Sequence, residues 1–136
     1  MNAVAYQLAP GEDRPTVLVV EDEVLIRFMV ADELRKQGLN VVEASDAEEA
    51  LSVLQSAVPV HLLLTDLQMP GNFDGMALAG LVHARFPAIK IVVASARLPE
   101  VSLAGIAHAA VSKPYDITAI ISQVKELLTD SQHHAN

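Results

Sequence analysis

Short apolar runs alternate along this chain with longer segments in which apolar residues recur every three or four positions. The runs predict five strands, at Val17–Val20, Leu39–Ala44, Val60–Thr65, Ile89–Ala94 and Ala109–Ser112. Several of these runs are apolar throughout, which is typical of strands that are covered on both faces. The segments between and after the strands predict five helices.

The predicted helices lie at Glu23–Gln37, at Ser45–Ser56, from Asp74-Gly75 to Pro87, near Pro99–Ile106, and from Ile117 onward. In the first, Val24, Phe28 and Leu34 contribute to the apolar side, and Gly38 ends the helix. The fourth is dominated by Ala and Gly and is expected to be short or irregular. The last helix has the clearest i, i+3, i+4, i+7 apolar pattern.

Helix caps support three of these boundaries. Ser45 and Glu48, three residues apart, have the spacing of a capping box. Asp74 and Asp116 precede the third and the last helix and are expected to be N-caps. For Asp74 this interpretation is favoured over a metal-binding role.

Strands that alternate with helices predict an α/β fold with a parallel sheet and helices on both faces. Right-handed crossovers leave few strand orders, and we expect the flavodoxin-like order 2-1-3-4-5 of a (βα)5 domain. The domain is expected over residues 15–130, between a flexible lead-in, residues 1–14, and a flexible tail, residues 131–136.

Composition excludes several classes of protein. Apolar residues make up 51% of the chain, which rules out a disordered protein, and the net charge of −8 argues against nucleic-acid binding. The absence of cysteine excludes disulfides and thiolate zinc sites. No apolar run approaches the roughly 18 residues of a membrane span, and no signal peptide is recognisable. A cytoplasmic location is expected.

The histidines do not suggest a metal site. His61, His83 and His108 are scattered among apolar neighbours without ligand spacing, and a core or surface role is expected for each. The pair at 133 and 134 lies in the predicted tail and is expected to be solvated.

Acidic residues mark the ends of two predicted strands. Glu21 and Asp22 follow the first strand, and Asp66 follows the third. In the predicted order these strands are neighbours, so their carboxyl ends bring the three acids to one edge of the sheet. Gathered carboxylates repel one another unless a cation joins them, and Mg²⁺ prefers such oxygen ligands.

Two further groups reach the same edge, Ser95 after the fourth strand and Lys113 after the fifth. Phosphoryl transfer requires a nucleophile, a metal ion and donors that take up developing charge. Asp66 is the candidate nucleophile and Lys113 the candidate cation. Ser95 is the candidate hydroxyl donor, and Mg²⁺ would lie between the acids.

These motifs resemble those of the receiver domains of response regulators, the CheY-like family. The resemblance rests on Val-Val-Glu-Asp-Glu, Thr-Asp-Leu-Gln-Met-Pro-Gly, Ala-Ser-Ala and Ser-Lys-Pro-Tyr, each at a strand end and in the family's order. It extends over about Thr16–Thr129. The four motifs together are far more specific than any one of them.

The resemblance implies that Asp66 accepts a phosphoryl group from a phosphohistidine on a sensor kinase or a phosphotransfer protein. Asp22 would bind Mg²⁺ directly, Glu21 directly or through water, and the backbone carbonyl of Gln68 would complete the protein ligands. Such a protein is a signalling switch with no enzymatic turnover of an external substrate beyond its own phosphorylation and dephosphorylation.

The resemblance also assigns the groups that would contact the phosphoryl group. Lys113 would hold it, with Lys113-Pro114 in the cis form. Ser95 stands where the family has a Thr or Ser that moves toward the phosphoryl group, and Ala96 follows it in the same switch region.

The chain departs from the family pattern in ways that concern signal output. Ala110 replaces the aromatic residue that usually moves inward on activation. Ser95 and Lys113 are closer in sequence than is usual, and the loop Pro70–Gly75 is one residue longer. Tyr115 is expected to pack beside the last helix.

We expect a stand-alone receiver that signals through protein contacts or acts as a phosphate shuttle or sink. A downstream protein, or a second copy in a weak homodimer, would bind the face formed by the fourth helix, fifth strand and fifth helix. Two alternatives stay open. One is a haloacid-dehalogenase-like phosphatase, which would need an acid where this chain has Gln68, and the other is a pseudo-receiver that switches without phosphate.

Overall fold

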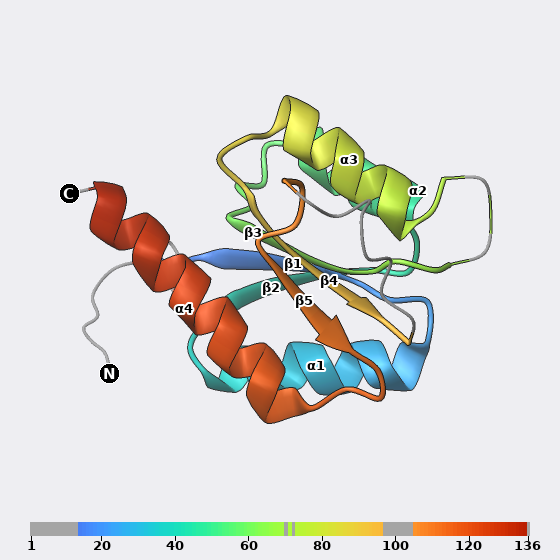
Figure 1. Cartoon of the computed structure of the whole chain (residues 1–136), viewed down its shortest axis with the longest axis horizontal. Helices are drawn as coiled ribbons and strands as arrows, with labels where there is room; N and C mark the ends of the chain where they lie inside the picture. Colours follow the sequence, from blue (N-terminus) through green and yellow to red (C-terminus); the bar gives the residue numbers. More distant parts are fainter. Residues whose placement is uncertain (1–13, 70, 72, 97–104, 136) are drawn as a thin grey trace.

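The computed structural model describes residues 14–69, 71, 73–96 and 105–135. Its elements are β1 (Thr16–Val20), α1 (Val24–Lys36), β2 (Asn40–Ala44), α2 (Ala47–Leu54), β3 (Leu62–Asp66), α3 (Gly75–Arg85), β4 (Lys90–Ser95), β5 (Ala109–Ser112) and α4 (Ile117–Ala135). All strand pairs are parallel, and the order β2-β1-β3-β4-β5 confirms the predicted sheet. Helices α2 and α3 lie on one face, and α1 and α4 on the other (Figure 1).

The sheet is buried on both faces because its central strands carry apolar side chains in both directions. Leu18 and Leu63 belong to the core cluster beneath α2 and α3. Val19 and Leu64, the next residue in each strand, belong to the cluster beneath α1 and α4. Covering both faces explains why these strands show no polar alternation.

Side-chain caps define the starts of three helices. Asp74 Oδ1 accepts the N–H of Ala77 at α3, and Asp116 Oδ1 accepts the N–H of Ala119 at α4, as predicted. The predicted capping box at α2 is wrong by one residue. Its N-cap is Asp46, whose Oδ1 accepts the Glu49 N–H.

The Glu49 carboxylate reaches back to the N–H of Ser45 at the same helix. Ser45 is therefore the residue before the cap. Ser45 and Asp46 are two successive acceptor residues, and each has an acid three positions on, Glu48 and Glu49. The sequence therefore allows two registers of the same motif, and spacing alone does not choose between them.

Two segments remain, the connection from β4 to β5 and the end of α4. Most of the helix predicted near residues 99–106 lies outside the described residues, and Gly105 and Ile106 form a turn. Helix α4 continues to Ala135, past residue 130, where the sequence analysis placed the end of the domain. No Gly or Pro interrupts this stretch to stop the helix. None of the described helices combines the length and hydropathy that a membrane crossing requires.

Candidate functional site

Three carboxylates meet at the carboxyl edge of the sheet. The register that pairs Val20 of β1 with Thr65 of β3 places Glu21 beside Asp66. Glu21, Asp22 and Asp66 each contribute one carboxylate oxygen to a group in which all three oxygens lie within 4.8 Å of one another. Glu21 and Asp66 are only 2% and 3% exposed, whereas Asp22 is open to solvent. The predicted convergence of these acids is therefore observed.

Lys113 supplies positive charge to this cluster from the other side of β4. Its Nζ lies 2.9 Å from Asp66 Oδ2 and 3.4 Å from Glu21 Oε1. The residue follows β5, and the peptide bond to Pro114 is cis, as expected from the family pattern. Proximity to the two acids outweighs burial and raises the pKa of the Lys113 ammonium, so the group stays charged.

The pKa values of the two neighbouring acids after β1 are shifted in opposite directions. Burial alone would raise the pKa of Glu21, but hydrogen bonds from the Glu23 N–H and the Tyr115 hydroxyl, with others, lower it overall. Burial, followed by the contact with Glu21, raises the pKa of Asp22. Glu21 thus stays ionised, and Asp22 gives up its proton less readily while no cation is near.

Tyr115 joins the site through its hydroxyl, which the sequence analysis did not foresee. The Tyr115 Oη donates to Glu21 Oε1 at 2.8 Å. Burial and the nearby Glu21 charge raise the pKa of the phenol, so it remains a donor. The ring also packs against the cluster beneath α1 and α4, as predicted, and lies 5.4 Å from Lys113 Nζ. In the sequence, the feature that indicates this contact is the position of Tyr115 two residues after Lys113, at the same edge of the sheet.

Ser95 and Gln68 form a second polar connection to Asp66. The buried Ser95 hydroxyl donates to Gln68 Oε1 at 2.7 Å, and the Gln68 N–H donates to Asp66 Oδ1 at 3.2 Å. Ala96, the next residue, is exposed. The metal-binding role of the Gln68 backbone carbonyl stays a prediction.

The backbone of Asp66 is fixed by the start of α3. A side chain at Gly75 would overlap the carbonyl oxygen of Asp66, so only glycine allows α3 to begin this close to β3. The Thr65 hydroxyl donates to the same carbonyl at 2.9 Å. These contacts set the position of the Asp66 carboxylate.

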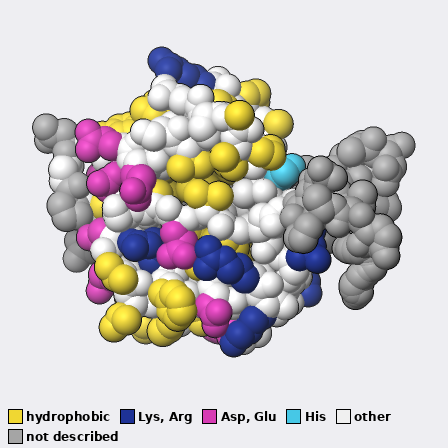
Figure 2. All heavy atoms as spheres, turned by 180° about the vertical axis from the view of Figure 1, so that it is seen from behind, with side chains coloured by type: hydrophobic (Ala, Val, Ile, Leu, Met, Phe, Trp, Pro, Cys, Tyr) yellow, Lys and Arg dark blue, Asp and Glu magenta, His cyan; other side chains and the backbone are white. Residues whose placement is uncertain are grey.

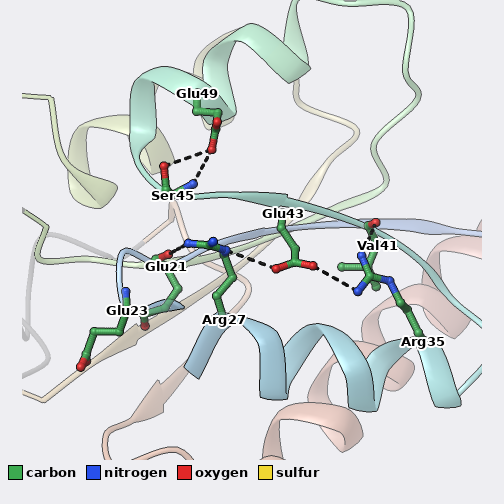
Figure 3. A network of polar contacts seen from close by, with 8 residues as sticks. All are labelled: Glu21, Glu23, Arg27, Arg35, Val41, Glu43, Ser45 and Glu49. Carbon is green, nitrogen blue, oxygen red and sulfur yellow. Dashed lines mark hydrogen bonds and ion pairs between the residues drawn. The ribbon is translucent and has the colours of Figure 1, made fainter. Parts of the chain in front are cut away.

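A network of charged side chains holds Glu21 from the α1 side (Figure 3). Arg27 Nη1 donates to the backbone oxygen of Glu21 at 2.9 Å, and its Nε contacts Glu43 Oε1 on β2 at 3.2 Å. Arg35 binds the other oxygen of Glu43 at 3.1 Å. The bend of the chain after β1 is thereby tied to both α1 and β2.

The first turns of α1 expose apolar side chains beside the acids. Leu25 is 78% exposed, and Val24, Phe28 and Met29 are each more than half exposed. Figure 2 shows hydrophobic side chains gathered low on that face, where α1 lies. The prediction that Val24 and Phe28 belong to the core side is wrong, because α1 packs on the sheet through its second half, where Leu34 is buried. We call Val24, Leu25, Phe28 and Met29 the α1 patch.

Ala110 lies in β5 opposite Val93 and is exposed. Its methyl group is the whole side chain at the position where the family has an aromatic residue. Among the described residues of this region, Tyr115 is the aromatic side chain that contacts the acids.

Two histidines bind backbone at the opposite, amino edge of the sheet. His61 Nδ1 accepts the N–H of Thr16 at 3.0 Å, and His108 Nδ1 accepts the N–H of Ile91 at 3.0 Å. Burial, followed by nearby positive charge, lowers the pKa of His108. In the described part of the chain, the group of three or more side chains with metal-ligand spacing is the acid cluster, and it contains no histidine.

The acid cluster fits a hard divalent cation. Two of its three carboxylates are buried, and Lys113 is the cationic side chain that contacts them among the described residues. One ammonium leaves negative charge uncompensated, and oxygen ligands within 4.8 Å suit Mg²⁺.

The sequence of this chain is similar to those of known proteins. Residues 17–125 match the family model of the response regulator receiver domain. The transcriptional regulatory protein BaeR of Escherichia coli is 31% identical over 126 residues, 90% of this chain and 51% of that protein. The transcriptional regulatory protein AruR of Pseudomonas aeruginosa is 31% identical over 127 residues, 88% of this chain and 51% of that protein. The chain spans about half the length of these curated relatives.

Solved structures give the same fold. A response regulator receiver domain protein (CheY-like) from Methanospirillum hungatei superposes with a TM-score of 0.81 at 22% identity, covering 89% of this chain and 98% of that one. The response regulator TrrA from Thermotoga maritima, solved in complex with Mg²⁺–BeF, has a TM-score of 0.75 at 28% identity, covering 83% of this chain and 98% of that one.

Proposed function

The chain belongs to the response regulator receiver family of two-component signalling proteins, and on that premise we propose that Asp66 is its phosphoacceptor. The observation that carries the proposal is the contact of Lys113 Nζ with Asp66 Oδ2 at 2.9 Å, inside a cluster of three carboxylates. An aspartate nucleophile needs such a cation to hold the phosphoryl oxygens that arrive.

The donor is a phosphohistidine on a sensor kinase or a phosphotransfer protein. An Asp66 carboxylate oxygen attacks phosphorus, the O–P bond forms and the N–P bond breaks. The electron pair of the broken bond stays on the imidazole nitrogen. Lys113 then pairs with the phosphoryl oxygens as it now pairs with Oδ2.

The ligands of Mg²⁺ would be the carboxylates of Glu21, Asp22 and Asp66 and the backbone carbonyl of Gln68. When bound, Mg²⁺ neutralises charge between the carboxylates and the phosphoryl oxygens. Two of these ligands are held in place without a cation. Arg27 binds the backbone of Glu21, and the start of α3 packs against the carbonyl of Asp66.

Ser95 is the hydroxyl donor to the phosphoryl group, with Ala96 in the same switch segment. The contact of Ser95 Oγ with Gln68 Oε1 must break for this to happen, because one hydroxyl proton cannot serve both acceptors. With Ala110 at the aromatic position, the response to phosphorylation passes through other side chains.

The phosphodonor protein docks over the α1 patch. Any protein that brings a phosphohistidine to Asp66 must approach the carboxyl edge of the sheet, and the exposed apolar residues of α1 begin two positions after Asp22, at that edge. Covering them would remove apolar surface from water. Downstream binding or weak dimerisation is expected at the face of β5, α4 and the segment before β5.

The stand-alone arrangement and the cytoplasmic location stay predictions. An immunoblot of native cells, fractionated into soluble and membrane parts, tests both. A soluble band at 14.5 kDa is expected, whereas a band about twice that mass would indicate a further domain, as in the longer relatives.

Labelling by a small-molecule phosphodonor tests the phosphoacceptor. The protein is incubated with acetyl phosphate and Mg²⁺, and incorporation is measured by intact-protein mass spectrometry. Asp66→Asn should abolish labelling. The matched control is Asp74→Asn, the same chemical change at a helix N-cap where Asn serves equally well.

Retained labelling of Asp66→Asn would contradict the proposal. Turnover of an external phosphomonoester would instead favour the phosphatase alternative. Absence of labelling in the wild type with intact Mg²⁺ binding would favour the pseudo-receiver.

A further inference from the structure

The Glu21 carboxylate is bound unequally at its two oxygens. Oε1 accepts the Tyr115 hydroxyl at 2.8 Å and lies 3.4 Å from Lys113 Nζ. Oε2 accepts the Glu23 N–H at 3.1 Å. A carboxylate oxygen has about two lone-pair sites. The Asp22 side chain also contacts this carboxylate. Apart from Asp22, the described donors give Oε1 two partners and Oε2 one, so Oε2 is the more open of the two oxygens.

Tyr115 is held from both sides along the chain. Pro114 precedes it and Asp116, the N-cap of α4, follows it, while its ring packs in the cluster beneath α1 and α4. A phenol fixed in this way cannot follow a rotation of the Glu21 carboxylate. The hydroxyl therefore opposes that rotation.

We propose that Tyr115 is a positioning residue for the divalent-cation site, a role that rests on the function proposed above. By occupying Oε1, its hydroxyl reserves the open site on Oε2 for the cation. The same contact links the acid cluster directly to the start of α4. In a chain with Ala110 at the usual aromatic position, this gives the site an aromatic partner from the segment after β5.

The test compares Tyr115→Phe with Tyr6→Phe, which removes the same atom from the only other tyrosine. Mg²⁺ binding is measured by titration calorimetry on the full chain. Tyr115→Phe should weaken Mg²⁺ binding by about 10-fold, the effect expected when a metal ligand loses its supporting hydrogen bond. Tyr6→Phe should leave the dissociation constant unchanged.

A double-mutant cycle separates positioning from a general effect on folding. In a Glu21→Gln background, Tyr115→Phe should have no further effect on Mg²⁺ affinity, because the carboxylate that it positions is gone. A 10-fold loss in both backgrounds, or a lower melting temperature with unchanged Mg²⁺ affinity, would overturn the proposal. Failure of the wild type to bind Mg²⁺ would instead overturn the proposed function.

A second measurement keeps Tyr115 intact, so it applies even if Tyr115→Phe does not fold. The chain has no tryptophan and two tyrosines, so in Tyr6→Phe all tyrosine fluorescence comes from Tyr115. Addition of Mg²⁺ should change this emission, with a midpoint equal to the calorimetric dissociation constant. Constant emission at saturating Mg²⁺ would contradict a contact between Tyr115 and the cation site.

Discussion

Replacing Lys113 by methionine should destabilise the protein in a way that Mg²⁺ reverses. Methionine keeps an unbranched side chain of similar length and removes the charge. The change leaves Glu21 and Asp66, which are 2% and 3% exposed, without their ammonium partner. The two neighbouring carboxylates then repel each other, and both are too buried for solvent to screen the repulsion well.

The size of this effect follows from the two contacts. At an effective dielectric constant of about 20, unit charges at 2.9 Å and 3.4 Å attract by about 6 and 5 kcal/mol before desolvation is counted. Loss of one partner of a buried ion pair costs about 3–5 kcal/mol. The Lys113 side chain is 20% exposed, which favours the lower end, about 3 kcal/mol.

The free energy of unfolding, measured by urea titration in EDTA and again in Mg²⁺, tests this prediction. In EDTA, Lys113→Met should lose about 3 kcal/mol of unfolding free energy. Mg²⁺ at 100 times its dissociation constant returns about 2.7 kcal/mol by linkage, and it should bind the variant more tightly than the wild type because a competing charge is gone. Lys125→Met is the control, since that lysine contacts only Gln37 among the described residues and is exposed.

A stability of Lys113→Met in EDTA equal to that of the wild type would refute the reasoning. It would mean that the acids are neutral in the folded protein without Lys113. An equal gain from Mg²⁺ in variant and wild type would separately refute the claim that ammonium and cation compete for the same carboxylates.

Two further predictions concern the backbone at the two edges of the sheet. Gly75→Ala should cost about 3 kcal/mol, the upper end of the usual range for overpacked sites, because its Cβ would overlap the Asp66 carbonyl. Gly80→Ala, with open space around it in the same helix, should be neutral or stabilising, and thermal unfolding measures both changes. The lowered pKa of His108 means that the folded state binds fewer protons than the unfolded state, so its contribution is present above about pH 6.5 and is lost as pH falls below that value. His108→Asn, which keeps an acceptor for the Ile91 N–H, should reduce the loss of stability between pH 7.5 and pH 5.5 in urea melts, and an unchanged difference would contradict the assignment.

The sequence predicts the acid cluster well because the position of these residues follows from the order of the strands. Parallel strands present their carboxyl ends at one edge, so the residues at the ends of the neighbouring strands β1 and β3 must meet once the strand order is known. The long side chain of Lys113, which follows β5, reaches them across the end of β4. Glu21, Asp66 and Lys113 are brought together in this way. Their chemical types, two acids and an amine, then limit what the site can do.

The sequence is less informative where several arrangements satisfy the same pattern. The apolar residues of α1 fit a helix face, but only the contact of its second half with the sheet decides that Phe28 stays exposed. The Tyr115 ring could be predicted to pack, whereas the direction of its hydroxyl depends on the course of the chain from Lys113 to Asp116. The register of the α2 cap, at Ser45 or Asp46, is a similar case.

The positive partner of the site comes from far along the chain, and this has a consequence for the order of folding. Glu21 and Asp22 follow β1 and Asp66 ends β3, whereas Lys113 follows β5, 47 residues after Asp66. During synthesis, all three acids leave the ribosome before the ammonium that neutralises them. An intermediate without β5 would therefore carry unpaired buried charge, and divalent cations in the cell would act as a temporary substitute until Lys113 docks.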